Sequence, residues 1–307
     1  MNKIEKKAQV MSEHLVDGDR MGFKLSFETS SGSYIRTSVP EGCFSERVLP
    51  PKTVTESDSK IQKDIETDTF VYVEDIEVDA VAAQVGFRAE DEPVFVDGSR
   101  YAIKIGKIET ETTKKPQIEL MVAKDIIKML NKNNVEAIAR IQDTAFLKIC
   151  NAVVTTTAAQ AKFVNSAGVY SRVDLANTMN VISDQELIPD KWLMSNSAWI
   201  TMMASPLASI DSLAGVVFQD GLPKKMLMGL PVETSVKKGL FTDASDATEN
   251  YIYLFTAPEY LGKIIKIGTD TMWSKWEKDI FHWSSWRYVG MGFGDTRGIA
   301  RLSDKES

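Results

Sequence analysis

The sequence predicts an α+β fold in which strand-rich segments precede and follow one long helix along the chain. Three features of the chain of 307 residues support this class. Residues 69–110 are rich in β-branched and aromatic residues, residues 124–154 have the apolar spacing of a helix, and residues 191–303 mix short helices with strands. Because helices and strands do not alternate regularly, this order favours α+β over a doubly wound parallel sheet.

The first 66 residues are polar and have little regular periodicity. Five residues that break helices and strands interrupt them: Gly32, Pro40, Gly42, Pro50 and Pro51. A segment of this composition buries too little apolar surface to form a core by itself. We therefore predict an extended N-terminal arm over residues 1–66, which needs another surface to pack on.

A strand and a hairpin are predicted after the arm. Residues 69–81, TFVYVEDIEVDAV, combine imperfect alternation with high β propensity. In PVFVDGSRYAIKIGKIET, 93–110, the pair Asp97 and Gly98 separates two β-rich runs, which predicts a hairpin with a tight primed-type turn. Since an isolated two-stranded ribbon is marginally stable in water, we expect this hairpin to lie on another surface.

The longest amphipathic helix is predicted in the segment 124–154, with Asn133 or Asn134 as its N-cap. Its apolar residues recur at helical spacing: Val135, Ile138, Ile141, Ala145, Phe146, Ile149 and Val153. The simplest interpretation of this pattern is a core helix.

Several shorter elements are predicted in the second half of the chain. KWLMS, 191–195, is a strand that runs into a helix, NSAWITMMAS, capped by Asn196 or Ser197. KKMLMGLPVETSVKKG, 224–239, indicates two strands around a Gly-Leu-Pro bend. Further strands are predicted in 251–268, 279–293 and 298–303.

The glycines of VGMGFGDTRGIARLS, 289–303, suggest either a phosphate-binding loop or closely packed backbone. A dinucleotide fingerprint needs its third glycine where Asp295 stands, followed by a helix and a second strand. Only nine residues follow Gly298, too few for either. A bent terminal strand, in which glycine permits close backbone approach, is the better interpretation.

Composition excludes several functional classes. The formal net charge of −7 argues against a surface that grips nucleic acid, because such surfaces cluster Lys and Arg. Cys43 and Cys150 are the only cysteines, which favours a reducing compartment over a disulfide scaffold. The N-terminus lacks the apolar core of a signal peptide, and no segment approaches the length of a membrane span.

The inventory of catalytic residues is nearly empty, and we expect no catalytic residue, cofactor or metal site. His14 and His282 are the only histidines, and His282 is expected to be packed rather than to act as a base. The acidic stretch 74–79 lacks the calcium-binding pattern, so a solvated or inter-subunit face is the better interpretation. Six tryptophans lie near the C-terminus, where core or interface is favoured over a sugar or base platform: Trp192, Trp199, Trp273, Trp276, Trp283 and Trp286.

From about residue 67 to its end, the sequence resembles the major capsid proteins of tailed phages, which have the Hong Kong 97 type capsid fold. The resemblance follows the order of several pieces: the polar arm, the hairpin at Asp97 and Gly98, the junction 107–130 into the long helix, WLMSNSAWITMMA, MLMGLPVETS and WRYVGMGFGDTRGIARLS. MGLPV and GMGFGDTRGIARL are its most specific parts.

This resemblance implies five regions. They are an N-terminal arm at 1–66, an E-loop with flanking peripheral-domain strands at 67–118, a peripheral domain with a long spine helix at 119–169, an axial domain at about 170–260, and closing peripheral strands at 261–307. The residues expected to contact a neighbouring subunit lie in the E-loop: Asp97, Gly98, Arg100, Lys104 and Lys107.

The function implied by the resemblance is a shell subunit that forms hexamers and pentamers of an icosahedral capsid around double-stranded DNA. Its expected partners are its own copies, a separate scaffolding protein, a portal at one vertex, a possible decoration protein and DNA held only by non-specific contact, with no membrane. The expected location is the virion capsid, assembled in the host cytoplasm. An encapsulin-like compartment and a soluble glycan-active enzyme are the alternatives.

Two family features are not expected. Only about 66 residues precede the E-loop, fewer than a cleaved N-terminal scaffolding segment requires, so processing is doubtful and scaffolding is assigned to a separate protein. Some members join neighbouring subunits covalently through an E-loop lysine and a distant asparagine. Lys104 or Lys107 fits the first role, but no asparagine is marked for the second.

Overall fold

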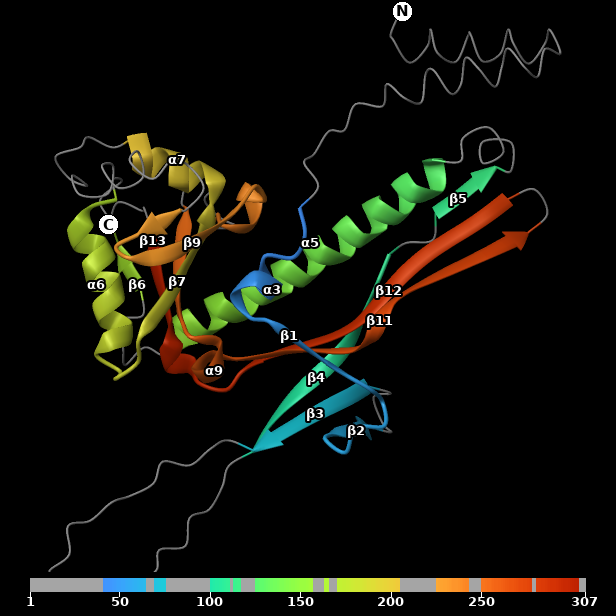
Figure 1. Cartoon of the computed structure of the whole chain (residues 1–307), viewed down its shortest axis with the longest axis horizontal. Helices are drawn as coiled ribbons and strands as arrows, with labels where there is room; N and C mark the ends of the chain where they lie inside the picture. Colours follow the sequence, from blue (N-terminus) through green and yellow to red (C-terminus); the bar gives the residue numbers. More distant parts are fainter. Residues whose placement is uncertain are drawn as a thin grey trace, which may run out of the picture. The chain divides into compact units, whose positions relative to one another are not determined.

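The computed structural model describes residues 41–64, 69–75, 100–110, 113–116, 125–156, 163–165, 170–204, 225–242, 250–277 and 280–303 (Figure 1). These residues form the predicted α+β fold. The chain divides into two compact units, one made of residues 1–42, 109–139 and 270–286 and the other of the remaining residues.

The described part of the first unit contains β5 (Thr113–Pro116) and the start of α5 (Asp125–Thr156). It also contains the C-terminal part of β11 (Gly262–Glu277) and the N-terminal part of β12 (Ile280–Phe293). Strand β5 pairs antiparallel with β12. The buried Asn134 of α5 donates from Nδ2 to Ser285 Oγ at 3.3 Å. The N-cap prediction is therefore wrong, because α5 begins at Asp125 and both Asn133 and Asn134 lie inside it.

The first of two sheets has the strand order β1 (Pro51–Val54), β11, β12, β4 (Arg100–Glu109), β3 (Thr69–Asp75) and β2 (Ile61–Asp64). In the described residues it has seven strands, because β5 pairs with the N-terminal part of β12. Strand β1 runs parallel to β11, whereas β2, β3 and β4 are successive antiparallel neighbours.

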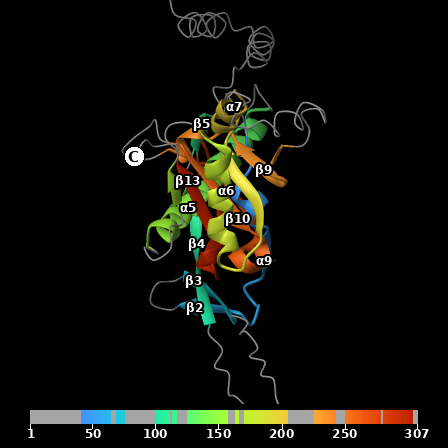
Figure 2. The same ribbon diagram turned by 90° about the vertical axis from the view of Figure 1, so that its left-hand side faces the viewer.

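The second sheet lies wholly in the second unit. Its order is β6 (Phe163–Asn165), β13 (Ile299–Ser303), β10 (Tyr251–Thr256), β7 (Pro189–Ser195), β9 (Leu230–Ser235) and β8 (Met226–Leu227). Helix α6 (Arg172–Ser183) packs on β13 and β10, as Figure 2 shows. The predicted closing segment 261–307 thus supplies strands to both sheets, and its domain assignment stays a prediction.

Short polar and glycine signals set the ends of these elements. Ser171 forms a capping box with Asp174 at the start of α6. Ser195 Oγ accepts the Ala198 N–H at 3.0 Å where α7 (Asn196–Ala204) begins, so the predicted cap at Asn196 or Ser197 is wrong by one position or two. The predicted bend between β8 and β9 lies at Met228 and Gly229, which have positive φ.

Strand β4 has a different partner from the one predicted. Arg100 pairs with Asp75 and Ile105 with Phe70, so β3 lies beside β4 over these residues rather than the run just before Asp97. The tight-hairpin pairing of this strand is therefore wrong. Asp97 and Gly98 lie outside the described residues, and their turn stays a prediction.

The buried face of α5 differs in part from the predicted stripe. Ile138 and Phe146 are buried as predicted, but Val135 and Ile141 are exposed. The buried face continues through four other residues: Ala139, Leu147, Cys150 and Val154. It also includes the polar Gln142 and Asp143, which a search for apolar periodicity passes over.

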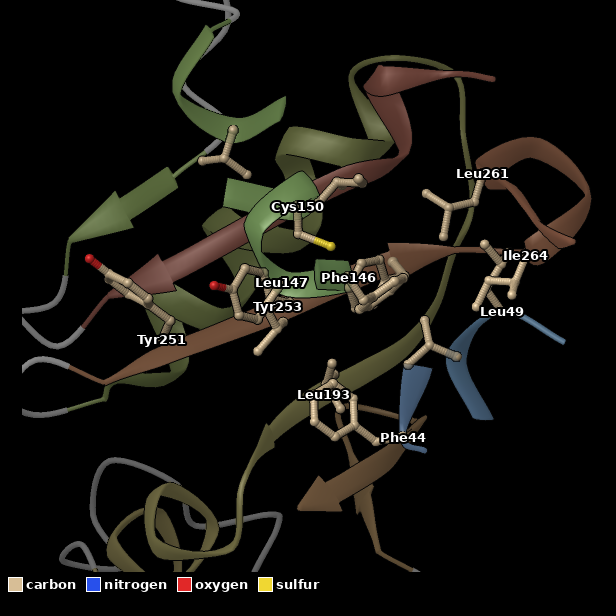
Figure 3. Close-up of a cluster of buried hydrophobic side chains, with 14 of the residues drawn as sticks. Phe44, Leu49, Phe146, Leu147, Cys150, Leu193, Tyr251, Tyr253, Leu261 and Ile264 are labelled. Carbon is tan, nitrogen blue, oxygen red and sulfur yellow. The ribbon is translucent and has the colours of Figure 1, made fainter. Parts of the chain in front are cut away.

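The largest core cluster joins α5 to both sheets and to the N-terminal segment (Figure 3). Phe44 and Leu49 flank α3 (Ser45–Val48) and are buried with Phe146 of α5 and Leu193 of β7. Residues 1–66 were expected to need another surface to pack on, and for the described residues around α3 that surface comes from α5 and β7 of the same chain. A short apolar sequence was sufficient here because α5 and β7 supply the rest of the core.

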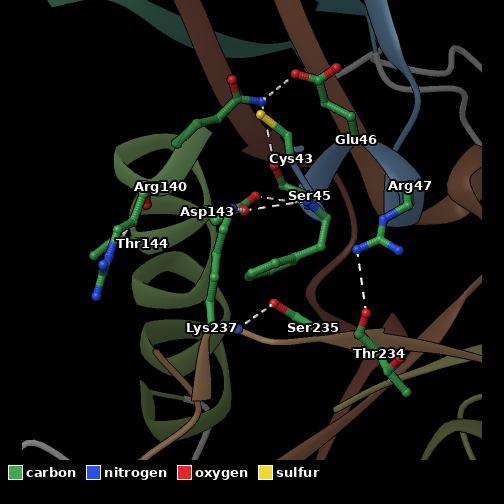
Figure 4. Close-up of polar contacts among 12 residues, drawn as sticks. Cys43, Ser45, Glu46, Arg47, Arg140, Asp143, Thr144, Thr234, Ser235 and Lys237 are labelled. Atoms are coloured by element: carbon green, nitrogen blue, oxygen red, sulfur yellow. Dashed lines mark hydrogen bonds and ion pairs between the residues drawn. The ribbon is translucent and has the colours of Figure 1, made fainter. Parts of the chain in front are cut away.

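Asp143 fastens α3 to α5 (Figure 4). Its side chain is fully buried and accepts the backbone N–H groups of Phe44 at 3.3 Å and Ser45 at 3.0 Å. The Lys237 ammonium lies 2.6 Å from the same carboxylate. Helix α3 has no side-chain cap of its own, so a carboxylate from α5 supplies one.

A second polar cluster surrounds Glu46 of α3. Its Oε1 lies 2.7 Å from Lys266 Nζ and 3.1 Å from Arg287 Nη1, and it accepts from Gln142 Nε2 at 3.0 Å. Burial favours the neutral acid, but the Lys266 and Gln142 contacts outweigh it and hold the pKa of Glu46 below its ordinary value. Burial and the nearby carboxylates raise the pKa of the Cys43 thiol to about 12. Cys43 is therefore a protonated, structural thiol.

The alternate glycines of β12 make room for side chains of β4. A Cβ at Gly290 would lie 2.7 Å from the Lys104 carbonyl oxygen, and one at Gly292 would lie 2.8 Å from Ile103 Cγ1. Gly294, two residues after Gly292, faces the ring of Tyr101, two residues before Ile103. The interpretation of this segment as closely packed backbone is thus confirmed for Gly290 and Gly292.

Gly292→Ala is expected to destabilise the chain by about 1–3 kcal/mol, because the new methyl group overpacks against Ile103. Urea unfolding measures this cost. Gly106→Ala in β4 is the matched control, since nothing lies within 4 Å of its added Cβ. In Ile103→Ala, which removes the clashing atom, Gly292→Ala should cost clearly less; an equal cost in both backgrounds would contradict this packing.

Asp143→Asn is expected to cost about 3–5 kcal/mol in unfolding free energy, because it leaves the Lys237 cation without its buried carboxylate. Adding Lys237→Met should recover part of that loss. Glu233→Gln is the control: Glu233 pairs with Arg47 of the same short helix, but that pair is exposed and worth less than about 1 kcal/mol. Equal losses in Asp143→Asn and Glu233→Gln would refute the anchoring role of Asp143.

Candidate inter-subunit surface

The predicted contact residues that the structure describes lie on β4. Arg100, Lys104 and Lys107 are all exposed. Lys104 is four positions after Arg100, an even step along the strand, so the two side chains share one face. Asp97 and Gly98, the other two predicted contact residues, lie outside the described residues.

The inner face of β3 and β4 belongs to a core cluster. Tyr72, Ile103 and Ile105 are buried together with Val54 of β1 and Ile265 of β11. Tyr72 lies opposite Ile103 in the antiparallel register. This face explains why the two strands are ordered without a neighbouring subunit, although the sequence alone favoured support from another surface.

The outer face of β3 and β4 combines apolar and charged side chains. Val71 lies opposite Lys104, Val73 opposite Ala102, and Asp75 opposite Arg100. The two valines are half-buried, whereas the other four residues are exposed. We call these six residues the outer face; its small apolar centre flanked by charges resembles the composition of protein interfaces.

Glu74 connects the inner side of these strands to the rest of the sheet. Its Oε1 lies 2.7 Å from Lys263 Nζ and 3.5 Å from Lys60 Nζ. Burial disfavours its charge, but the two ammonium groups outweigh burial and keep the pKa of Glu74 below its ordinary value. Burial, reinforced by the Glu74 charge, raises the pKa of Tyr101 to about 12. At neutral pH Glu74 is therefore charged and Tyr101 is a neutral donor to it.

The described acidic residues of the stretch 74–79 are paired with cations. Glu74 is engaged by lysines, Asp75 pairs with Arg100, and Glu77 and Asp79 lie outside the described residues. Within the parts of the chain that the structure describes, no group of three or more His, Cys, Asp or Glu is placed to hold a metal ion. The interpretation as a solvated or inter-subunit face fits the exposed Asp75, but not Glu74, whose side chain lies on the inner side with Lys263 and Tyr101.

Three of the six tryptophans are buried in the described residues. Trp192 and Trp199 belong to the cluster beneath α6 and α7, and Trp283 is buried on β12. Trp273 is 40% exposed. His282 is half-buried on β12 opposite Lys114, and His14 lies outside the described residues.

The valines of the outer face were missed by the sequence analysis. Val71 and Val73 lie in a strand that was predicted, but only the register with β4 places them between Arg100 and Lys104. The available signal was their alternation with Phe70 and Tyr72, which separates two faces of the strand. Alternation alone does not tell which face is left uncovered.

No helix in the described residues is long and apolar enough to cross a membrane. No family model matches the sequence, and no curated protein matches it. Solved structures supply the comparison instead.

Several capsid structures share the fold. A chain from the capsid of a native GTA particle is 15% identical with a TM-score of 0.60, and the match covers 89% of this chain and 93% of that one. The capsid of cyanophage P-SCSP1u matches at 11% identity with a TM-score of 0.62, covering 90% and 92%. The capsid of cyanophage Pam1 matches at 8% identity with a TM-score of 0.60, covering 89% and 94%.

These identities are too low to transfer a binding residue, but each match covers about nine tenths of this chain. The sequence resemblance and the structural match, reached independently, agree on one architecture. This chain has the fold of phage capsid proteins.

Proposed function

We propose that this chain is the major capsid protein of a tailed phage and forms hexamers and pentamers of an icosahedral shell around double-stranded DNA. One observation carries the proposal: the match extends over about nine tenths of this chain and of each capsid chain compared. A subunit that shares this fold throughout is suited to the same repeated, heterologous contacts that close into rings.

The chemistry of the described residues supports a structural role. The candidate bases and nucleophiles are occupied in packing: Cys43 and Cys150 are protonated thiols with raised pKa values, and Glu46 and Glu74 pair with cations. The net charge of −7 suits a shell that encloses DNA without gripping its phosphates. Scaffolding, portal and decoration proteins are proposed as separate partners.

Electron microscopy of the chain, produced together with the genes that flank its own, tests this function. We expect closed shells of megadalton mass, and nuclease-protected DNA inside particles from a productive host. Small oligomers at every concentration would contradict the proposal. Closed shells that never protect DNA would instead support the encapsulin-like alternative.

We also propose that the outer face of β3 and β4 is an inter-subunit contact. Lys104 and Arg100 flank Val71 and Val73, so a neighbouring subunit that covers the face buries apolar surface and meets two cations. Because each copy carries excess negative charge, an acidic surface on the neighbour is the complement. Lys107, Asp97 and Gly98 are proposed as further contact residues of the same segment.

Lys104→Glu and Arg100→Glu are expected to lower the particle yield severely while the subunit melts nearly as the parent does. Both side chains are exposed, and the pair between Arg100 and Asp75 is exposed on both sides, so little folding stability depends on them. Lys104→Gln should have a smaller effect than Lys104→Glu, because it removes attraction without adding repulsion. Lys238→Glu, at an exposed site away from β4, is the position control.

Particle yield by sedimentation and subunit melting by circular dichroism are measured side by side. A parental yield for both Lys104→Glu and Arg100→Glu would remove the outer face from the inter-subunit contacts. Loss of yield with a matching loss of melting temperature would assign these residues to folding instead.

A further inference from the structure

A cavity of about 540 Å³ lies beside the C-terminal half of α5, apart from the outer face. One side is formed by Thr144, Leu147, Lys148 and Asn151, whose spacing places them on a single face of the helix. The other side comes from the segment around η1 (Lys238–Leu240), from β10 and from β13: Gly239, Leu240, Thr242, Tyr251 and Arg301. Its volume is in the range of small-molecule sites.

Arg301 is held in a fixed orientation at this cavity. Its guanidinium lies over the ring of Tyr251, 4.2 Å from the ring centroid, and its Nη1 donates to Asn151 Oδ1 at 3.1 Å. Asn151 is oriented in turn by the hydroxyl of Tyr253, which donates to the same oxygen at 2.7 Å. A guanidinium ordered in this way loses little conformational entropy when it binds an anion.

The charged side chains in the described lining of the cavity have one sign. Lys148 and Arg301 are cations, and no carboxylate is among the described residues that line it. The nearest carboxylate along α5, Asp143, is engaged by Lys237 and by the backbone of α3. Thr144 and Thr242 add hydroxyl groups, which are further donors to an oxyanion.

Apart from Asn151, whose side-chain oxygen accepts from Arg301 and Tyr253, the remaining described lining is apolar. Leu147, Leu240 and the ring of Tyr251 offer surface for the body of an organic molecule beside the cations. Two cations in a concave site, on a chain of net charge −7, differ from the extended basic stripe that binds a nucleic acid backbone. The arrangement therefore favours a small ligand over DNA.

We propose that this cavity binds a small organic phosphate, with the phosphate group between Lys148 and Arg301 and the organic part against Leu147, Leu240 and Tyr251. The ligand bridges α5, the η1 segment and β13, so it stabilises the folded subunit by mass action. The proposal is independent of the proposed function, since it concerns the subunit and not its assembly.

Thermal unfolding of the subunit with deoxyadenosine monophosphate, inorganic phosphate or deoxyadenosine, at matched ionic strength, tests the site. The melting temperature should rise and saturate with the two phosphates, at lower concentration for the nucleotide, and should not respond to deoxyadenosine. Lys148→Gln, a change at an exposed side chain, should weaken nucleotide binding about tenfold or more. Lys132→Gln, exposed on the same helix but outside the cavity, is the control.

Arg301→Lys keeps the charge but loses the planar fork, and should weaken binding while sparing much of the fold. An equal response to deoxyadenosine, or no saturable response to either phosphate, would overturn the proposal. So would parental binding by Lys148→Gln, which does not depend on the stability of the Arg301 variant. A response to duplex DNA but not to the nucleotide would assign the site to another class of ligand.

Discussion

The buried carboxylate of Asp143 is the interaction on which the position of α3 and of the strand that follows it depends. It accepts two N–H groups of a helix that is too short to stabilise itself and is paired with Lys237, so one charged group joins α3, α5 and the segment after β9. A charge buried this deeply is tolerated only with all its partners present. With α3 in this position, Phe44 and Leu49 lie in the core and β1 pairs with β11.

In the first sheet, β3 and β4 are closely packed on one face and largely exposed on the other. Gly290 and Gly292 of β12 let Ile103 and Ile105 approach, so the inner face of β4 is complete within the chain. On the outer face the two valines are half-buried and the other four side chains are exposed, so in the described residues this face is packed less closely than the inner one. On the proposed assignment of the outer face, folding and assembly use opposite faces of the same strands, and substitutions on one face can be tested without disturbing the other.

Much of the fold was predictable because local signals and packing agree. The long helix, the strands at 69–75 and 191–195 and the role of the β12 glycines were found from periodicity and composition. The start of α5 and the packing of Phe44 were not, because Asn134 bonds to Ser285 and Asp143 bonds to α3 across long sequence distances. For the candidate site, Arg100 and Lys104 were singled out from the sequence as contact residues, a role that stays a prediction, whereas Val71 was found only through strand register.

Hydrogen exchange of the Ser45 amide tests the anchoring of the N-terminal segment most directly. The Ser45 and Lys60 amides both donate to aspartate side chains, Asp143 in the first case and Asp58 in the second, but only the first bond is buried. If Asp143 anchors α3 in the core, Ser45 should exchange as slowly as the buried amides of α5, such as that of Phe146, and far more slowly than Lys60. Exchange of Ser45 at the rate of Lys60 would contradict this account.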